Sequence, residues 1–145
     1  MISIEYPAYQ PKIKETAGKE FIFDAVRKKW VVLTPEEWVR QNFLQYLVQV
    51  KQYPASLIAV EKEINVADTK KRFDIVVYDK NHQPFMIVEC KEMNVEMDNK
   101  TLDQVLRYNI ALQVPYLVIT NGSYCFGFSI AAGVMSAINE LPFFK

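Results

Sequence analysis

The residues of this chain whose types and spacing could do chemistry are two carboxylates and a lysine. Asp74 directly follows a short basic run, and Glu89-Cys90-Lys91 lies a short distance further along the chain. Carboxylates supply the hard oxygen ligands that Mg²⁺ prefers, and a nearby ammonium group can orient a water or stabilise negative charge on a phosphate. A metal held by such ligands also lowers the pKa of its bound water. These side chains therefore indicate metal-assisted hydrolysis of a phosphodiester bond.

The residue types that are scarce exclude several other chemistries. The chain has one histidine, His82, two cysteines and four scattered glycines. A zinc hydrolase needs two histidines on one helix, and a structural zinc site needs four closely spaced Cys or His ligands. A P-loop or a dinucleotide-binding loop needs several glycines within one short segment. His82 lies in a segment with the composition of a turn, which disfavours a Ser-His-Asp triad.

The charges balance overall, with 17 basic and 17 acidic residues, but they are unevenly spaced along the chain. Lys70, Lys71 and Arg72 form a basic run directly ahead of Asp74, where we expect them to contact the phosphates of a nucleic acid. The apolar segment 124–138 is too short to span a membrane, and the N-terminus does not resemble a signal peptide. We therefore expect a cytoplasmic protein with no membrane contact and with Cys90 and Cys125 as reduced thiols.

The elements that must position Asp74, Glu89 and Lys91 begin with an N-terminal extension and a helix. We expect residues 1–33 to form an extension packed on the core, with a hairpin of segments 21–24 and 30–33. Residues 34–145 then form one domain. Thr34 is the predicted N-cap of a helix that runs to about residue 50, with Pro35 in the first turn and Glu37 completing a capping box. Glu36 lies on the inward apolar stripe of this helix.

Five strands and two more helices are predicted in the rest of the domain. Strands 73–78 and 85–91 follow strand 57–64 and pair as an antiparallel hairpin across the turn 79–84. A helix capped by Asn99 or Thr101 extends to about residue 113, strands 116–120 and 124–128 follow, and a short helix covers 130–140. The expected fold class is α/β, with a mixed sheet flanked by helices. The hairpin places Asp74 opposite the strand end from which Glu89 and Lys91 project together.

Five segments of the chain, in order, resemble those of a known nuclease group. The spacing of Asp74 and Glu89-x-Lys91 looks like the PD-(D/E)xK nuclease superfamily, and the wider match is similar to the N-terminal nuclease domain of type I restriction enzyme R subunits. The matching segments are Thr34-Pro35-Glu36-Glu37-Trp38-Val39-Arg40-Gln41, Arg72-Phe73-Asp74-Ile75-Val76-Val77-Tyr78, Val88-Glu89-Cys90-Lys91, Gln104-x-x-x-Tyr108 and Thr120-Asn121-Gly122. The resemblance implies a restriction-endonuclease-like fold in the order α-β-β-β-α-β-β, preceded by the extended N-terminal segment.

The resemblance also implies roles for individual residues. Asp74 and Glu89 would bind Mg²⁺ or Mn²⁺ together with the Cys90 carbonyl, and Lys91 would assist the attacking water. An acidic residue of the first helix commonly joins this cluster, and we expect Glu36, because the cap geometry occupies Glu37. Gln104 and Tyr108 share one face of a helix and would lie beside the site, where they contact nucleic acid or orient catalytic groups.

The sequence therefore predicts a Mg²⁺-dependent endonuclease-like domain that hydrolyses DNA, with the core Asp74, Glu89 and Lys91. The residue before Asp74 is Phe73 rather than proline, a frequent variation. The chain carries no P-loop for the ATP-driven motor that accompanies this domain in restriction enzymes, so we expect a homodimer or separately encoded motor and specificity subunits as partners. Two alternatives stay open: a non-catalytic module with the nuclease fold that binds nucleic acid or a partner, and a purely structural oligomerisation domain.

Overall fold

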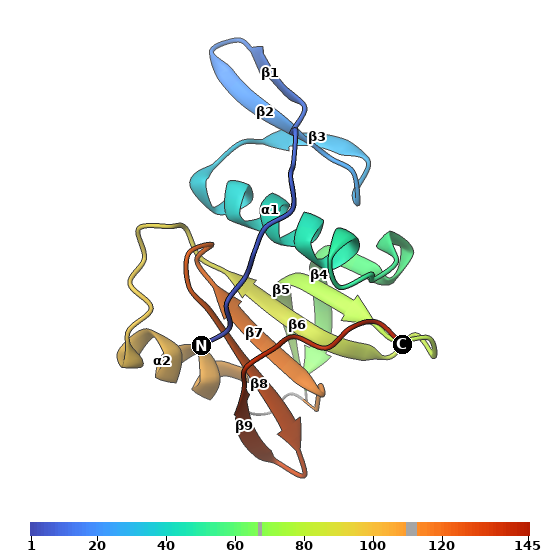
Figure 1. Cartoon of the computed structure of the whole chain (residues 1–145), viewed down its shortest axis with the longest axis vertical. Helices are drawn as coiled ribbons and strands as arrows, with labels where there is room; N and C mark the ends of the chain where they lie inside the picture. The colour runs from blue at the N-terminus through green and yellow to red at the C-terminus, as the bar shows by residue number, and fades with distance from the viewer. Residues whose placement is uncertain (67, 110–112) are drawn as a thin grey trace.

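The computed structural model describes residues 1–66, 68–109 and 113–145, which form a small sheet, a large sheet and two α-helices (Figure 1). Three strands precede the first helix, and six follow it. The elements in chain order are β1 (Ile13–Thr16), β2 (Lys19–Asp24), β3 (Lys29–Val32), α1 (Pro35–Gln49), the 3-10 turn η1 (Ala55–Leu57), β4 (Ile58–Val66), β5 (Thr69–Tyr78), β6 (Pro84–Cys90), α2 (Asn99–Asn109), β7 (Tyr116–Thr120), β8 (Cys125–Ala131) and β9 (Val134–Ile138).

Helix α1 begins where the sequence predicts. The Thr34 hydroxyl accepts a hydrogen bond from the Glu37 N–H at 3.0 Å, and Pro35 occupies the first turn, where its missing N–H costs nothing. The predicted capping box also requires the Glu37 side chain to accept from the N–H of Thr34, and the structure shows other partners for it. The Glu37 carboxylate accepts from Arg27, Arg40 and Gln41, so it belongs to a network of buried charges.

The large sheet is mixed, as predicted, with the strand order β4-β5-β6-β7-β8-β9. Neighbouring strands are antiparallel except β6 and β7, which are parallel. Strands β5 and β6 form the expected hairpin. In its turn the Asp79 carboxylate accepts from the N–H groups of Asn81 and Gln83, and His82 adopts a left-handed backbone (φ 60°). His82 is exposed within this turn.

The two helices cover opposite faces of this sheet. Alternate strand residues point to opposite faces, and those on one face, such as Ile75 and Val88, pack against Val39, Phe43 and Leu47 of α1. Their neighbours Val76, Ile87 and Leu117 form a second cluster, against which Leu106 of α2 packs. Burial on both faces explains why β6 and β7 appear in the sequence as continuous apolar runs.

The N-terminal segment forms a second sheet on the far side of α1 (Figure 1). The predicted hairpin is present as β2 and β3, and β1 adds a third antiparallel strand that the sequence reading missed. The turn between β1 and β2 contains Ala17 and Gly18, both with positive φ, which suits a two-residue hairpin. Before β1, Ile2 makes an isolated bridge with Cys125, and the Tyr6 hydroxyl donates to the Gly122 carbonyl at 3.0 Å. Residues near the N-terminus therefore lie against the large sheet.

Two sequence predictions are wrong, one about the type of an element and one about the cap of a helix. The predicted helix 130–140 is instead the end of β8 followed by β9. Ala132 and Gly133 have φ values of 52° and 75°, so they form a tight turn, and β9 pairs along the edge of β8. Pairing with β9 satisfies the N–H and C=O groups along the edge of β8, which a helix over 130–140 would leave unpaired. At α2 the cap is Asp98, whose carboxylate accepts from the Thr101 N–H at 2.9 Å, rather than Asn99 or Thr101. The predicted end near residue 113 passes through 110–112, which lie outside the described residues.

Within the described ranges, no helix is both long enough and apolar enough to cross a membrane.

The contact between the N-terminal sheet and α1 rests on Asp24, which is fully buried. Its carboxylate accepts from the N–H groups of Val26 and Arg27, from the Arg27 guanidinium, and from the Gln41 amide at 2.9 Å. Although burial opposes ionisation, the hydrogen bonds from Arg27 and Gln41 hold the pKa of Asp24 below its ordinary value. The carboxylate is therefore charged and fully paired.

We expect Asp24→Ala to lower the free energy of unfolding by about 3 kcal/mol, because it leaves the Arg27 charge and the Gln41 amide short of a buried partner. Urea denaturation measures this loss. Glu15→Ala is the control, because Glu15 is exposed at the outer end of β1, and it should change stability by less than about 0.5 kcal/mol. Equal stability of the two variants would contradict the anchoring role of Asp24.

Candidate active site

Asp74 lies on β5 at a point where the strand pairing is irregular. Pairs Val60↔Ile75 and Lys62↔Phe73 flank the position, and between them Glu61 has a left-handed backbone, with φ 52°. The pairing between β5 and β6 starts only at Ile75↔Val88. Asp74 therefore stands where β6 separates from β5, at an unpaired position within the β4–β5 ladder, so its carboxylate is open to side chains from other elements.

Both oxygens of the Asp74 carboxylate have a donor. Oδ2 accepts from the backbone N–H of Cys90 at 2.7 Å, which links β5 to the end of β6. Oδ1 accepts from Nη2 of Arg40 at 3.1 Å, which links β5 to α1. The carboxylate is thus held at the position that the predicted hairpin gives it, opposite the end of β6.

Glu89 is close enough to Asp74 for the two carboxylates to influence each other. Burial, together with repulsion and hydrogen bonding from the Asp74 carboxylate, raises the pKa of Glu89 to about 8, while the Lys91 ammonium opposes the shift. A perturbed carboxyl with a specific charged neighbour is typical of functional sites, although structural networks produce such shifts too. The structure therefore brings together Asp74, Glu89 and Lys91, the three residues that the sequence singled out.

The backbone around Lys91 is fixed by the neighbouring strand. The Lys91 N–H donates to the Thr120 carbonyl at 2.8 Å. The Asn121 side chain donates to the Val95 carbonyl at 2.9 Å, and its own carbonyl oxygen accepts from the N–H groups of Ser123 and Tyr124. The predicted Thr-Asn-Gly segment thus holds the chain that leaves β6, and with it Lys91.

Cys90 points away from Glu89 and Lys91, as the alternation of a strand predicts, and its side chain is buried. Burial raises the pKa of the Cys90 thiol well above its ordinary value, and the Asp74 carboxylate adds to the shift. The thiol is therefore protonated and unreactive at neutral pH. The assignment of the Cys90 carbonyl as a metal ligand stays a prediction.

Glu36 also reaches this cluster from the first turn of α1. Its side chain is 47% exposed and lies 3.5 Å from the Arg40 guanidinium. Burial and the nearby Asp74 carboxylate raise the pKa of Glu36, while Arg40 and Lys91 oppose the shift. Of the two glutamates in this turn, Glu36 is thus the one placed beside Asp74, although Glu37 is the more deeply buried.

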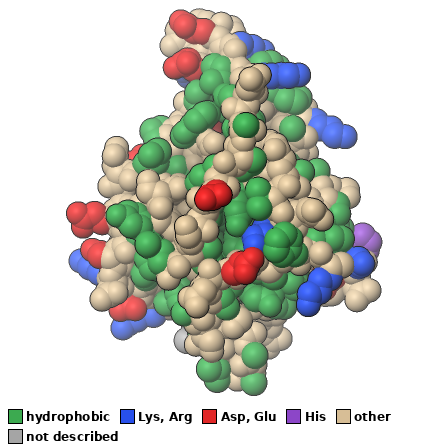
Figure 2. Space-filling view, in the orientation of Figure 1, with side chains coloured by type: hydrophobic (Ala, Val, Ile, Leu, Met, Phe, Trp, Pro, Cys, Tyr) green, Lys and Arg blue, Asp and Glu red, His purple; other side chains and the backbone are tan. Residues whose placement is uncertain are grey.

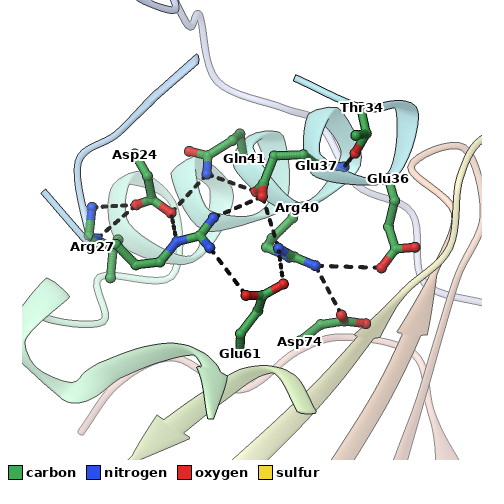
Figure 3. A network of polar contacts seen from close by, with 10 residues as sticks. Asp24, Arg27, Thr34, Glu36, Glu37, Arg40, Gln41, Glu61 and Asp74 are labelled. Carbon is green, nitrogen blue, oxygen red and sulfur yellow. Dashed lines mark hydrogen bonds and ion pairs between the residues drawn. The ribbon is translucent and has the colours of Figure 1, made fainter. Parts of the chain in front are cut away.

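Arg40 is the main residue of this region that the sequence analysis did not assign (Figure 3). Its side chain is only 5% exposed, and its Nε makes no hydrogen bond among the described residues. Although burial opposes it, the Glu37 and Asp74 carboxylates raise the pKa of Arg40 above its ordinary value. The guanidinium contacts four carboxylates, those of Glu36, Glu37, Glu61 and Asp74. The spacing of Arg40 from Glu36 and Glu37, by four and three residues on one helix, was the available signal.

A second arginine extends the same network to the N-terminal sheet (Figure 3). Arg27 contacts Asp24, Glu37 at 2.9 Å and Glu61 at 3.6 Å. Glu37 and Glu61 are therefore shared between Arg27 and Arg40, and the charges form one continuous chain from Asp24 to Asp74. The candidate site is connected in this way to the sheet on the far side of α1.

The donor set around Asp74 fits a hard divalent cation in its chemistry. The Asp74 carboxylate raises the pKa of both Glu36 and Glu89, and a bound cation would relieve this repulsion. The arrangement is not a finished metal cage, however. In the described part of the chain, no three His, Cys, Asp or Glu side chains are already grouped closely enough to hold a metal ion. One oxygen of Asp74 is paired with Arg40 at 3.1 Å.

The remaining predicted site residues lie elsewhere. Gln104 is exposed on α2, where it lines a hollow of about 860 Å³ together with Lys100, Asp103 and Arg107. The backbone of Tyr108 is in the same helix, one turn further along, but its side chain lies outside the described residues. The structure therefore supports the helical spacing of this pair and does not bring Gln104 into contact with Asp74.

The basic run belongs to strand β5, which begins at Thr69 rather than at the predicted residue 73. Lys70 and Arg72 are exposed, whereas Lys71 is half-buried. The Arg72 guanidinium lies 3.8 Å from the Glu63 carboxylate across the β4–β5 ladder. Contact of this run with phosphate stays a prediction.

The comparison with protein families identifies a match that spans the site. The model of the family described as type I restriction enzyme R protein N terminus matches residues 35–142, from the start of α1 to beyond β9. The comparison with curated proteins gave no match.

The raised pKa of Glu89 makes stability depend on pH. The folded protein keeps a proton on Glu89 up to about pH 8, whereas the unfolded chain loses it near pH 4, so the free energy of unfolding falls as pH rises between these values. We expect Glu89→Gln in chelator to differ little from the original protein at pH 5 and to be more stable at pH 9 by on the order of 4 kcal/mol. Thermal melts at the two pH values test this. Glu96→Gln, at an exposed position, should show no such difference, and a pH-independent effect of Glu89→Gln would contradict the assignment.

Arg40 should be far more important for stability than an ordinary surface arginine. We expect Arg40→Met to lower the free energy of unfolding by about 3 kcal/mol, because buried carboxylates lose their counter-charge. Arg40→Lys keeps the charge but not the planar fork, so it should recover only part of this loss. Arg72→Met is the matched control, since the Arg72 side chain is 64% exposed. Urea denaturation gives the three values, and a loss at Arg40→Met no larger than at Arg72→Met would rule out a central role.

Proposed function

Since the chain belongs to the family of type I restriction enzyme R protein N termini, we propose that it is a divalent-metal-dependent endonuclease domain that hydrolyses phosphodiester bonds of DNA. The observation that carries this proposal is the convergence of Asp74, Glu89 and Lys91 where β5 and β6 separate, with Asp74 raising the pKa of Glu89. Family membership supports a nuclease-related role, and the side chains at this point supply the chemistry for it.

In this proposal the carboxylates of Asp74 and Glu89, with Glu36 and the Cys90 carbonyl, hold Mg²⁺ or Mn²⁺. The bound cation supplies charge stabilisation at the scissile phosphate and a water of lowered pKa. The protein contributes the fixed position of Asp74, which the Cys90 N–H holds at 2.7 Å. Glu89 must release its proton before it can act as a ligand, so cation binding should strengthen as pH rises toward 8.

Lys91 is the residue to which we assign the positioning of the attacking water. Its ammonium group lies close enough to Glu36 and Glu89 to oppose the rise in the pKa of both. From there it can hold a water by hydrogen bonding and offset negative charge that develops on the phosphate. The strand pairing that fixes its backbone to Thr120 keeps this group on the side of the carboxylates.

Partners are part of the proposal because the balanced charge of the chain favours weak binding to DNA by this domain alone. We propose that a second copy of the chain, or separately encoded motor and specificity subunits, supply the additional affinity for the substrate. DNA is the substrate class that fits the family, and Lys70, Lys71 and Arg72 are the residues proposed to contact its phosphates.

A specific observation favours one alternative, a non-catalytic module that binds nucleic acid or a partner. Arg40 already neutralises one oxygen of Asp74, and the described side chains do not form a ready metal cluster. In such a module, Arg40 would be the permanent counter-charge of Asp74, and no cation would be needed.

Metal titration and cleavage together separate the two proposals. For the nuclease, Mn²⁺ should bind in calorimetry, raise the melting temperature and support cleavage of DNA. Lys91→Ala should lower cleavage by at least about 100-fold while keeping the thermal shift, whereas Asp74→Asn should lose both. Lys62→Ala, an exposed lysine of the neighbouring strand β4, is the control and should change neither.

The opposite results are equally informative. If neither Mg²⁺ nor Mn²⁺ binds or raises the melting temperature, the enzyme proposal fails and the non-catalytic module is favoured. If cleavage by Lys91→Ala equals that of the control, the assigned role of Lys91 is wrong even if the metal site is present.

A further inference from the structure

The N-terminal sheet separates its charges by strand alternation. In β2, Ile22 and Asp24 are buried, whereas Phe21 and Phe23 point the other way and are only partly covered. Cross-strand pairs carry this second face to the neighbouring strands, because Lys14 lies opposite Phe21 and Trp30 lies opposite Phe23. We call this the outer face; its members are Lys12, Lys14, Lys19, Phe21, Phe23, Trp30 and Val32.

The outer face carries lysines without acidic residues among β1, β2 and β3. Glu15, Glu20 and Asp24 all fall on the opposite side of their strands. Figure 2 shows the same separation at the tip of the molecule, where acidic side chains lie on one side and basic side chains on the other. The balanced charge of the whole chain therefore conceals a local positive face.

Two lysines of this face, Lys12 and Lys14, lie over aromatic rings. The Lys14 ammonium lies 4.4 Å from the centre of the Trp30 ring, and the Lys12 ammonium lies 5.7 Å from that of Phe23. Phe23 and Trp30 themselves pack edge to face, with their centres 5.4 Å apart. Trp30 nevertheless remains 38% exposed and Val32 46% exposed. Apolar rings and cations are thus presented together to solvent.

The outer face leads toward the candidate active site. A hollow of about 530 Å³ is lined by Phe21, Trp30 and Val32 of this face together with Arg40 and the acidic residues Glu36, Glu37 and Glu61. Arg40 and Glu36 both contact the Asp74 region, so a ligand on the outer face could continue toward the carboxylates.

We propose that the outer face binds a single-stranded segment of nucleic acid. Lys12 and Lys14 would take the phosphates, and an unpaired base would stack on Trp30 as the flexible Lys14 side chain moves to a phosphate. Rings with interleaved cations are the usual features of single-strand binding, because unpaired bases present their flat faces. A duplex would use the lysines but not the rings. Delivery toward Asp74 rests on the proposed function, whereas binding to this face does not.

Binding is tested without metal, by fluorescence anisotropy in chelator with a labelled oligothymidylate of about 16 nucleotides. We expect Trp30→Ala to weaken binding by about tenfold, because the stacking surface for a base is lost, and Trp30→Phe to retain binding, because an aromatic ring remains. The double variant Lys12→Ala/Lys14→Ala should reduce the slope of log affinity against log salt by about 1.4. Lys80→Ala is the matched control, since its ammonium lies 5.5 Å from the centre of the Phe144 ring, away from this face.

Tryptophan emission gives a direct second readout. The chain has two tryptophans, Trp30 and Trp38. In Trp38→Phe, the remaining Trp30 should be quenched by the oligothymidylate, and in Trp30→Phe the emission should not change. This measurement does not depend on any loss of stability in the alanine variants.

Unchanged affinity in both Trp30→Ala and the double lysine variant would overturn the proposal. So would a duplex that binds more tightly than the single strand and is insensitive to Trp30. Failure of the nuclease proposal gives a different pattern, because cleavage would then be absent while binding without metal still depends on Trp30. If DNA is cleaved but oligothymidylate binding does not depend on Trp30, the single-strand proposal is wrong while the proposed nuclease function stands.

Discussion

Two arginines, Arg40, which is buried, and Arg27, which is largely covered, determine where the candidate site stands. A guanidinium removed from water is tolerated only when carboxylates offset its charge and accept its hydrogen bonds. Arg27 and Arg40 satisfy this condition by recruiting carboxylates from four elements or their ends: Asp24 of β2, Glu37 of α1, Glu61 of β4 and Asp74 of β5. Because each carboxylate comes from a different part of the chain, the network fixes the N-terminal sheet, α1 and the large sheet in one arrangement.

Asp74 belongs both to this structural network and to the cluster that could do chemistry. One oxygen completes the coordination of Arg40, and the other holds the end of β6 through Cys90. Its charge also bears on Glu89, whose pKa it helps to raise. A substitution of Asp74 would therefore affect both folding stability and any reaction at the site. Glu89 and Lys91 do not belong to the ion pairs around the two arginines. Substitutions of these two residues therefore test the proposed reaction with less disturbance of that network.

The parts of the fold that follow from local chemistry could be predicted from the sequence, and those that depend on distant pairing could not. The start of α1 follows from Thr34 and Pro35, and the β5–β6 hairpin follows from its turn, which is why the meeting of Asp74 with Glu89 and Lys91 was predictable. Strand β9 was not, because its exposed and half-buried residues gain their structure from pairing with β8. Arg40 was missed for a related reason: an arginine on a helix is usually a surface residue, and only the tertiary fold gives it four carboxylates.

Glu61 contributes to the arginine network from a strained backbone conformation. A glutamate with φ 52° in the middle of a strand costs about 1 kcal/mol, and glycine would adopt the same angle without strain. The side chain reaches Arg27 and Arg40 from that position, at 3.6 and 3.4 Å, while almost half of it stays exposed. At position 61, the residue that would best relieve backbone strain is therefore not the residue that supplies the negative charge. A glycine there would relax the strand and leave two buried cations underneath it to share the remaining carboxylates, so tolerance at this position measures how much negative charge the arginines require.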